Sequence, residues 1–420
     1  MSLMALGSAI LGHSQDYVSY MTGDTADAVV QPEFGIVMMG GAGENDPAMI
    51  WFLEKANGGD VLVIRASGSD GYNDYLFSDL GVEVNSVETI VWNNANASQD
   101  EYVLSRLNQA EAVWMAGGDQ FDYVSYWKDT AVEDALNHLV NVRGGVIGGT
   151  SAGMAVLGGA YFSAEEGTVY SSEMLEDPYN FYATIGAGDF LDLPFLSEVI
   201  TDTHYDDPDR RGRHAGFLAR LIEDYQYFPI GIGCDEYTAV CVDETGKAYA
   251  YGESPQYEDY VYFLRPSCQE TFGPESCVSN EPLTWVRNQE ALKVLRIAAT
   301  EDGDQWFDLS NGMDFSGGEW QHWWMENEEL FVVEGEAPDC GTSILEIGVV
   351  SATAYPNPGT NKFTLQTNSL LPLEVFSMSG VRLVFANPQS NSLELNTQNW
   401  SSGVYLLKQG NWVQKWVKLP

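Results

Sequence analysis

The chain has 420 residues, of which 45% are hydrophobic and 12% aromatic, with 42 Gly and 16 Pro. This apolar content is enough for a large core and excludes a disordered or fibrous chain. The 61 Asp and Glu residues against 19 Lys and Arg give a formal net charge of -42. Such a field repels phosphate groups, so we do not expect binding to DNA, RNA or anionic lipid.

The start of the chain is similar in composition to a targeting signal. The first fifteen residues, MSLMALGSAILGHSQ, are similar to the apolar part of a secretory leader without its basic start. We therefore interpret residues 1–30 as a leader remnant with an N-terminal extension. No apolar run approaches the roughly 20 residues that cross a bilayer, so membrane insertion is not expected.

Residues 33–265 alternate short apolar strands with helical stretches, which predicts an α/β core with a mostly parallel sheet covered by helices. A later part adds a strand at 198–203, a helix at 212–224 and a hairpin made of 231–242 and 247–251. The first five strands are predicted at 35–39, 61–65, 89–92, 112–115 and 145–147, and the helices between them at 47–55, 98–109 and 131–142.

Residues 266–340 are acidic, less regular and rich in Trp. We interpret the Trp residues as closing the core of one unit spanning 31–340, with a sugar-binding platform as the alternative. None of the five cysteines forms a CxxC pair, so zinc is not expected. Cys268 and Cys277 flank a Gly-Pro turn and could form a disulfide in an oxidising compartment.

Beyond residue 341 the chain has few acids and short alternating strands, which predicts a small all-β sandwich over 341–420. This segment resembles the C-terminal sorting domains of the type IX (Por) secretion system. The likeness implies interaction with the secretion machinery and a secreted, extracellular or cell-surface location; an adhesive or carbohydrate-binding module is the alternative. The likeness lies in AYPNPGTNKFTLQT (354–367), LEVFSMSGVRL (373–383), LNTQNWSSGVYLLK (395–408) and QKWVKL (414–419).

The most informative stretch is GGVIGGTSAGMAVLGG (144–159), which places Ser151 in a G-x-S-x-G motif after a predicted strand. Small neighbours allow the sharp strand-to-helix turn that exposes a nucleophile at the carboxyl edge of a sheet. A plain tight turn or a phosphate cradle is the alternative. Serine needs a base, and His204 lies at the exit of a predicted strand, where active sites of parallel sheets gather. His214 is interpreted as packing within a helix.

Five motifs in order resemble the cyanophycinase and aspartyl dipeptidase family of serine peptidases. The likeness implies a flavodoxin-like, class I amidotransferase-like three-layer sandwich with Ser151 as nucleophile and His204 as general base. It implies Glu173 as the third member, with Glu165 or Glu166 left open. The motifs are GIVMMGGAGEND (35–46), EAVWMAGGDQ (111–120), GGTSAGMAVLG (148–158), TDTHYDDPDRRGRHAGFLARL (201–221) and GIGCDEYTAVCVDETGKAYAYG (231–252).

The same resemblance implies the remaining site residues. The amides of Gly117, Gly118 and Ala152 would form the oxyanion hole, and the substrate-binding residues would be Gln120, Asp202, Arg210 and Arg213. Thr203 and Pro208 replace a glutamine and an arginine expected there, so specificity for cyanophycin does not follow.

Together these observations predict an exported serine peptidase that cleaves peptide or isopeptide bonds next to Asp through a Ser-His-Glu triad. No metal and no organic cofactor is expected, and a homodimer is left open. An esterase with the same nucleophile, or an inactive binding module in which His204 lies far from Ser151, is the alternative.

Overall fold

The computed structural model describes residues 15–269, 271–338, 352–367, 373–377, 382–386, 390–409 and 412–419. They fall into two compact units, one ending at Pro338 and the other beginning at Asp339. Residues 1–14 of the proposed leader lie outside the described residues. Among the helices of the described residues, none is long and apolar enough to span a bilayer.

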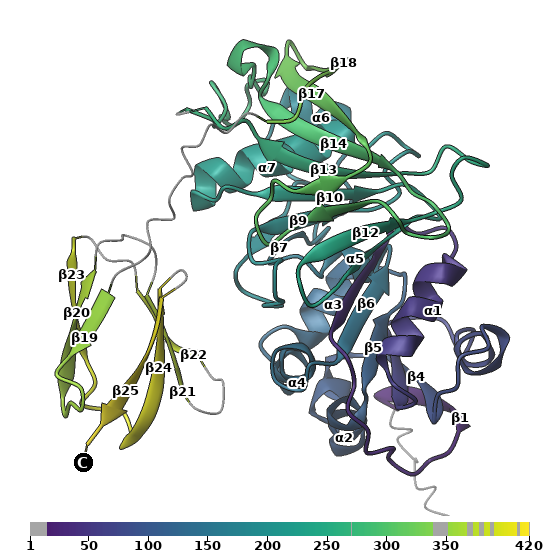
Figure 1. Ribbon diagram of the computed structural model, residues 1–420, viewed down its shortest axis with the longest axis vertical. Helices are drawn as coiled ribbons and strands as arrows, with labels where there is room; N and C mark the ends of the chain where they lie inside the picture. The colour runs from purple at the N-terminus through teal and green to yellow at the C-terminus, as the bar shows by residue number, and fades with distance from the viewer. Residues whose placement is uncertain are drawn as a thin grey trace, which may run out of the picture. The chain divides into compact units, whose positions relative to one another are not determined.

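The first unit is built on a ten-stranded sheet whose centre is parallel, as predicted (Figure 1). Strands β4, β3, β5, β6 and β2 run parallel, and the strands outside them pair antiparallel. In spatial order the strands are β1 (Tyr17–Gly23), β4 (Ser86–Trp92), β3 (Asp60–Arg65), β5 (Ala112–Met115), β6 (Val146–Thr150), β2 (Gly35–Met39), β11 (Ala239–Val242), β12 (Lys247–Tyr251), β15 (Trp306–Asp308) and β16 (Phe315–Ser316).

Helices cover both faces of this sheet, because its strands are apolar on both sides. Ile36 and Met38 of β2 pack into one core with α2 (Glu101–Gln109), α3 (Gln120–Trp127) and α4 (Ala131–Asn141), while Val37 and Met39 pack into another with α1 (Asp46–Lys55). Figure 1 shows α1 on one side of β5 and β6 and α4 on the other. The predicted α/β three-layer arrangement is confirmed. Two short helices lie at η1 (Tyr75–Asp79) and η2 (Ala95–Gln99).

A second, eight-stranded mixed sheet completes the first unit and was not predicted. The single strand expected over 231–242 is in fact two strands in different sheets, because the chain turns sharply at Tyr237 (φ 63°). The order is β18 (Glu329–Glu334), β17 (Glu319–Glu326), β14 (Leu292–Ala298), β13 (Tyr260–Pro266), β10 (Ile230–Cys234), β9 (Val199–Asp202), β7 (Ala160–Phe162) and β8 (Ile185–Ala187).

The segment expected to be irregular, 266–340, supplies much of this second sheet. Its Trp285 and Trp323 are fully buried against α6 (Ser171–Glu176) and α7 (Arg211–Tyr225), which agrees with a role in the core. A short helix, η3, spans Arg287–Gln289. The prediction of a disulfide between Cys268 and Cys277 is wrong. Cys268 is disulfide-bonded, but not to Cys277, which is buried and has a free thiol.

The second unit is all-β, as predicted. Its three-stranded and four-stranded sheets share one core that includes Phe363, Val375, Leu407 and Trp416. The strands are β19 (Ala352–Tyr355), β20 (Lys362–Thr367) and β23 (Ser392–Asn396) in one sheet, and β22 (Arg382–Ala386), β21 (Leu373–Ser377), β24 (Gly403–Gln409) and β25 (Trp412–Lys418) in the other.

Candidate active site

Ser151 lies at a sharp bend between β6 and α5 (Ala152–Ala155), with φ 51° and ψ −113°. Such angles are strained for a residue with a side chain, and they are typical of an exposed nucleophile between a strand and a helix. Glycine is required beside it, because a Cβ on Gly153 would lie 2.1 Å from the Met115 carbonyl oxygen. The Ser151 amide is fixed by donation to the Met39 carbonyl at 3.0 Å.

His204 reaches Ser151 from the second sheet, two residues beyond the end of β9. Its Nε2 lies 2.9 Å from the Ser151 hydroxyl oxygen, and its own amide donates to the Gly40 carbonyl at 2.9 Å. The imidazole passes directly over Gly41, where a Cβ would lie only 2.5 Å from Nε2. The loop after β2 therefore supports both the base and the nucleophile.

Glu236 orients His204, with its Oε1 2.6 Å from Nδ1. It lies in the turn after β10, and β10 runs parallel to β9, so the two strand ends meet at one edge. The Glu236 amide donates to Asp206 Oδ1 at 2.9 Å, which fixes the turn. A carboxylate at Nδ1 favours the tautomer with its proton there, leaving Nε2 free to accept the proton of Ser151.

The third member expected from the sequence, Glu173, makes a different contact in the structure, and its part in catalysis stays a prediction. Glu173 instead caps the start of α6, where its Oε2 accepts a hydrogen bond from the Tyr170 amide at 2.9 Å. An acidic side chain at this position satisfies an unpaired amide and complements the helix dipole. The open alternatives Glu165 and Glu166 are exposed in the loop before α6. The expectation assumed that the carboxylate lies between serine and histidine in the chain, but triads occur in several chain orders.

Of the three predicted oxyanion donors, Gly117 and Ala152 lie beside Ser151. Gly117 lines the same cavity, and a Cβ placed on it would be 3.6 Å from the Ser151 Cβ. Ala152 is the first residue of α5, where helical amides have no partner within the helix. Gly118 follows Gly117 and faces the Tyr123 hydroxyl, at 3.2 Å from a placed Cβ. Their role as oxyanion donors stays a prediction.

The four residues expected to bind substrate lie outside the cavity that contains Ser151. Asp202 and Arg213 form a buried pair, with Nε to Oδ2 at 2.8 Å and Nη2 to Oδ1 at 2.5 Å. Burial alone would raise the pKa of the Asp202 carboxyl, but Arg213 holds that pKa below its usual range. The remaining Arg213 nitrogen, Nη1, donates to Thr168 Oγ1 and the Val169 carbonyl, both at 3.1 Å. This pair therefore joins β9 to α7, and a role of its residues in binding substrate stays a prediction.

Arg210 and Gln120 are likewise directed elsewhere. Arg210 donates weakly to Thr203 Oγ1 at 3.4 Å and lines a separate cavity of about 150 Å³. Gln120 donates to the Phe162 carbonyl at 3.5 Å. His214, interpreted as packing, is fully buried, and burial lowers its pKa to about 4.

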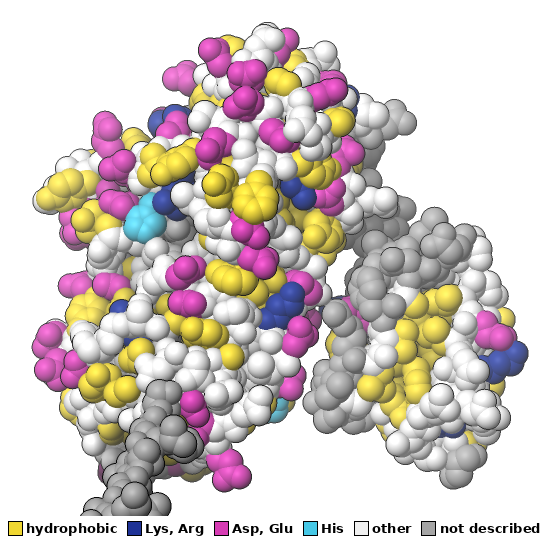
Figure 2. All heavy atoms as spheres, turned by 180° about the vertical axis from the view of Figure 1, so that it is seen from behind, with side chains coloured by type: hydrophobic (Ala, Val, Ile, Leu, Met, Phe, Trp, Pro, Cys, Tyr) yellow, Lys and Arg dark blue, Asp and Glu magenta, His cyan; other side chains and the backbone are white. Residues whose placement is uncertain are grey.

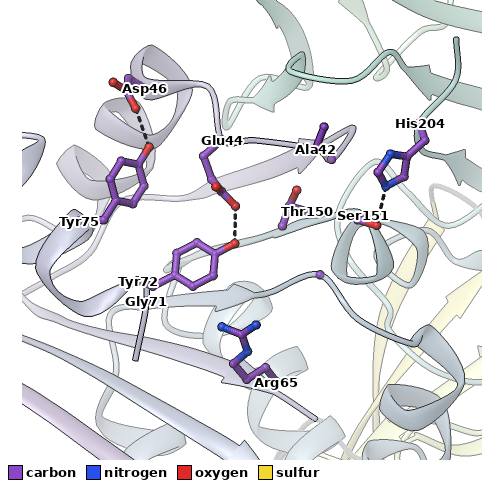
Figure 3. A pocket seen from close by; sticks show the side chains of 12 residues that line it. Ala42, Glu44, Asp46, Arg65, Gly71, Tyr72, Tyr75, Thr150, Ser151 and His204 are labelled. Atoms are coloured by element: carbon purple, nitrogen blue, oxygen red, sulfur yellow. Dashed lines mark hydrogen bonds between the residues drawn. The ribbon is translucent and has the colours of Figure 1, made fainter. Parts of the chain in front are cut away.

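The cavity beside Ser151 has a volume of about 640 Å³ and is lined by two further segments (Figure 3). The loop after β2 supplies Glu44, and the first residue of α1 is Asp46. The segment after β3 supplies Tyr72 and Tyr75, while Arg65 ends β3 itself. The Tyr72 hydroxyl donates to Glu44, and the Tyr75 hydroxyl donates to Asp46 at 2.7 Å. No feature of the sequence singled out these five residues as cavity-lining.

The hydroxyl, imidazole and carboxylate form the arrangement of a serine hydrolase. Residues 69–249 match the model of peptidase family S51, and residues 353–418 match that of the secretion system C-terminal sorting domain. Both resemblances predicted from the sequence, to the cyanophycinase family and to the sorting domains, are thereby confirmed.

Two cyanophycinases and one solved peptidase structure are similar to part of this chain. The chain is 29% identical to a cyanophycinase of Synechococcus elongatus over 232 residues, 52% of this chain and 66% of that protein. It is 28% identical to a cyanophycinase of Trichormus variabilis over 211 residues, 50% of this chain and 62% of that protein. The matches thus span somewhat less than two thirds of these relatives. A crystal structure of a peptidase from an acI-B1 Actinobacterium aligns with 15% identity and a TM-score of 0.40, covering 55% of this chain and 91% of that one.

Proposed function

We propose that this chain is an exported serine peptidase of cyanophycinase type, which hydrolyses peptide or isopeptide bonds next to aspartate. The observation that carries the proposal is the continuous contact from Ser151 Oγ to His204 Nε2 at 2.9 Å and from His204 Nδ1 to Glu236 at 2.6 Å. Both distances lie within hydrogen-bond reach, which a nucleophile, its base and the orienting group require. An inactive module in which His204 lies far from Ser151 is at odds with these distances.

The mechanism follows from the positions of these three groups. Ser151 Oγ attacks the carbonyl carbon of the scissile bond while His204 Nε2 takes its proton. Glu236 stabilises the imidazolium that forms and keeps its orientation. The amides of Gly117, Gly118 and Ala152 bind the oxyanion of the tetrahedral intermediate. His204 then returns the proton to the leaving amine. In the second half, His204 takes a proton from the water that attacks the acyl carbon, and it gives that proton to Ser151 Oγ as the bond between Ser151 and the acyl group breaks.

Two features support the proposed substrate and location. The curated relatives at 28–29% identity are cyanophycinases, and the cavity beside Ser151 contains a guanidinium, Arg65, that suits an acidic substrate. The match of residues 353–418 to the sorting domain supports export through the type IX machinery to the cell surface or medium.

The test is Ser151→Ala compared with the wild-type chain on cyanophycin and a panel of Asp-containing dipeptides. We expect the wild type to release products identifiable by mass spectrometry, and the variant to lose hydrolysis by on the order of 10⁵-fold or more in kcat while remaining folded. Assays with p-nitrophenyl esters distinguish a peptidase from an esterase. Near wild-type turnover by the folded variant would contradict the assignment of Ser151.

A further inference from the structure

Arg65 is a cation at the wall of the active-site cavity that the mechanism does not use. Of the described residues that line this cavity, it is the only Lys or Arg. It ends β3, at the same edge of the parallel sheet as the bend that carries Ser151, since β3, β5 and β6 run parallel. Figure 3 shows its guanidinium beneath the Tyr72 ring, on the side of the cavity away from His204.

The guanidinium has no carboxylate partner among the described residues, a state it shares with Arg265, which is buried on β13 and does not line the cavity. Eight other arginines each lie within 4.0 Å of an Asp or Glu oxygen: Arg106, Arg143, Arg210, Arg211, Arg213, Arg220, Arg287 and Arg296. An unpaired, half-buried guanidinium has lost part of its hydration without gaining a counter-charge. An anionic ligand group would supply that charge.

Arg65 is held in place by neutral groups, which leaves its charge available. Its Nε donates to the Ser67 carbonyl and its Nη1 to the Ser69 carbonyl at 3.3 Å. Its guanidinium carbon lies 5.8 Å from the centre of the Tyr72 ring. Tyr72 is itself fixed by donating to Glu44. A guanidinium fixed in this way loses little conformational entropy when it binds a ligand.

The rest of the cavity favours an anion with a single charge over one with two. Glu44 and Asp46 line the same cavity, and neither forms an ion pair with a described Lys or Arg. Their carboxylates repel a doubly charged phosphate more strongly than a singly charged carboxylate. The planar guanidinium also matches the geometry of a carboxylate.

We propose that Arg65 binds a carboxylate of the substrate and so determines the preference for acidic peptides, an inference that rests on the proposed peptidase function. The carboxylate belongs either to the acidic side chain next to the scissile bond or to the C-terminus of a short peptide. The two sources have the same chemistry, and the choice of substrates distinguishes them.

The experiment measures kcat/KM for four dipeptides: Asp-Leu, Asn-Leu and the C-terminal amide of each. The wild-type chain should prefer substrates that carry the carboxylate Arg65 binds. A faster rate for Asp-Leu than for Asn-Leu identifies the side-chain carboxylate, and a faster rate for the free acids than for their amides identifies the C-terminal carboxylate. In Arg65→Met we expect this preference to fall by about 10- to 100-fold, while the rate on the amide of Asn-Leu changes little. Arg65→Lys keeps the charge but loses the planar guanidinium, so its preference for the carboxylate substrate should lie between those of the wild type and Arg65→Met. It also serves as the second variant if Arg65→Met does not fold.

Arg296→Met is the matched control, because Arg296 pairs with Glu319 on the second sheet and does not line the cavity. It should keep the wild-type preference. If Arg65→Met slows all four substrates equally, Arg65 only supports its loop, and the inference is overturned while the peptidase function stands. If the wild type cleaves none of the four, nor cyanophycin, both proposals are overturned.

Discussion

Glu236 is the carboxylate on which the base depends, because it alone of the described carboxylates contacts the Nδ1 of His204 within 3 Å. Its replacement by Gln removes the charge that stabilises the imidazolium and offers an amide that can hold the wrong tautomer. In Glu236→Gln we expect kcat to fall by on the order of 10³- to 10⁴-fold, with a small change in KM. Steady-state kinetics on a cleaved dipeptide measures both.

Glu173→Gln is the control for this substitution. Glu173 caps α6 through the Tyr170 amide, and Gln keeps an acceptor at the same place. Its loss of charge should cost at most about 1 kcal/mol of unfolding free energy and leave kcat unchanged. If Glu173→Gln abolished turnover and Glu236→Gln did not, Glu173 and not Glu236 would be the third member of the triad.

At the scale of elements, the loop after β2 determines how closely the imidazole approaches Ser151. Gly41 has φ 111°, and a Cβ there would lie 2.5 Å from His204 Nε2 and 2.6 Å from Cε1. Gly41→Ala must therefore displace the ring, and a displacement of about 1 Å can cost 10²-fold in rate. We expect kcat/KM to fall by about that factor.

A matched glycine separates this contact from backbone strain. Gly81 also has a positive φ, 73°, but a Cβ on it would have no heavy atom within 4 Å. Gly81→Ala should thus lower the melting temperature about as much as Gly41→Ala and leave activity intact. Equal activity in the two variants, measured alongside their melting curves, would show that the loop does not position His204.

The sequence predicts those parts of the site that depend on local pattern. The bend at Ser151 follows from small residues between a strand and a helix, and His204 from its position after a strand. Glu236 cannot be found in this way, because the apolar pattern over 231–242 predicts a single strand. The turn at Tyr237 divides that run between two sheets, and strand pairing over long distances in sequence creates the second sheet.

The sequence also does not show which charged side chains pair with one another in the tertiary structure. Arg213 was expected to face substrate, yet it is buried against Asp202. Arg65 belongs to none of the motifs that resemble the family, and its position in the cavity becomes apparent only when β3 is placed beside β5 and β6. Which arginine remains unpaired depends on the packing of the whole unit.

At the scale of the molecule, the acidic charge is concentrated in one part of the chain. Residues 341–420 hold three Asp or Glu against five Lys or Arg, so the acidic excess lies in the first 340 residues. Figure 2 shows acidic side chains spread over the visible face of the first unit. An approaching anionic substrate is therefore repelled until it comes within reach of Arg65.

This repulsion predicts a dependence on salt that differs in sign between substrates. The screening length falls from about 30 Å at 0.01 M to about 8 Å at 0.15 M salt. Over this range kcat/KM should rise by about 3- to 10-fold for an anionic peptide and fall for a cationic one, because screening removes repulsion and attraction respectively. A neutral peptide amide of the same length is the control and should change little. Initial rates at low substrate concentration and a fixed pH measure the effect, and the same slope for all three substrates would exclude long-range steering by the acidic surface.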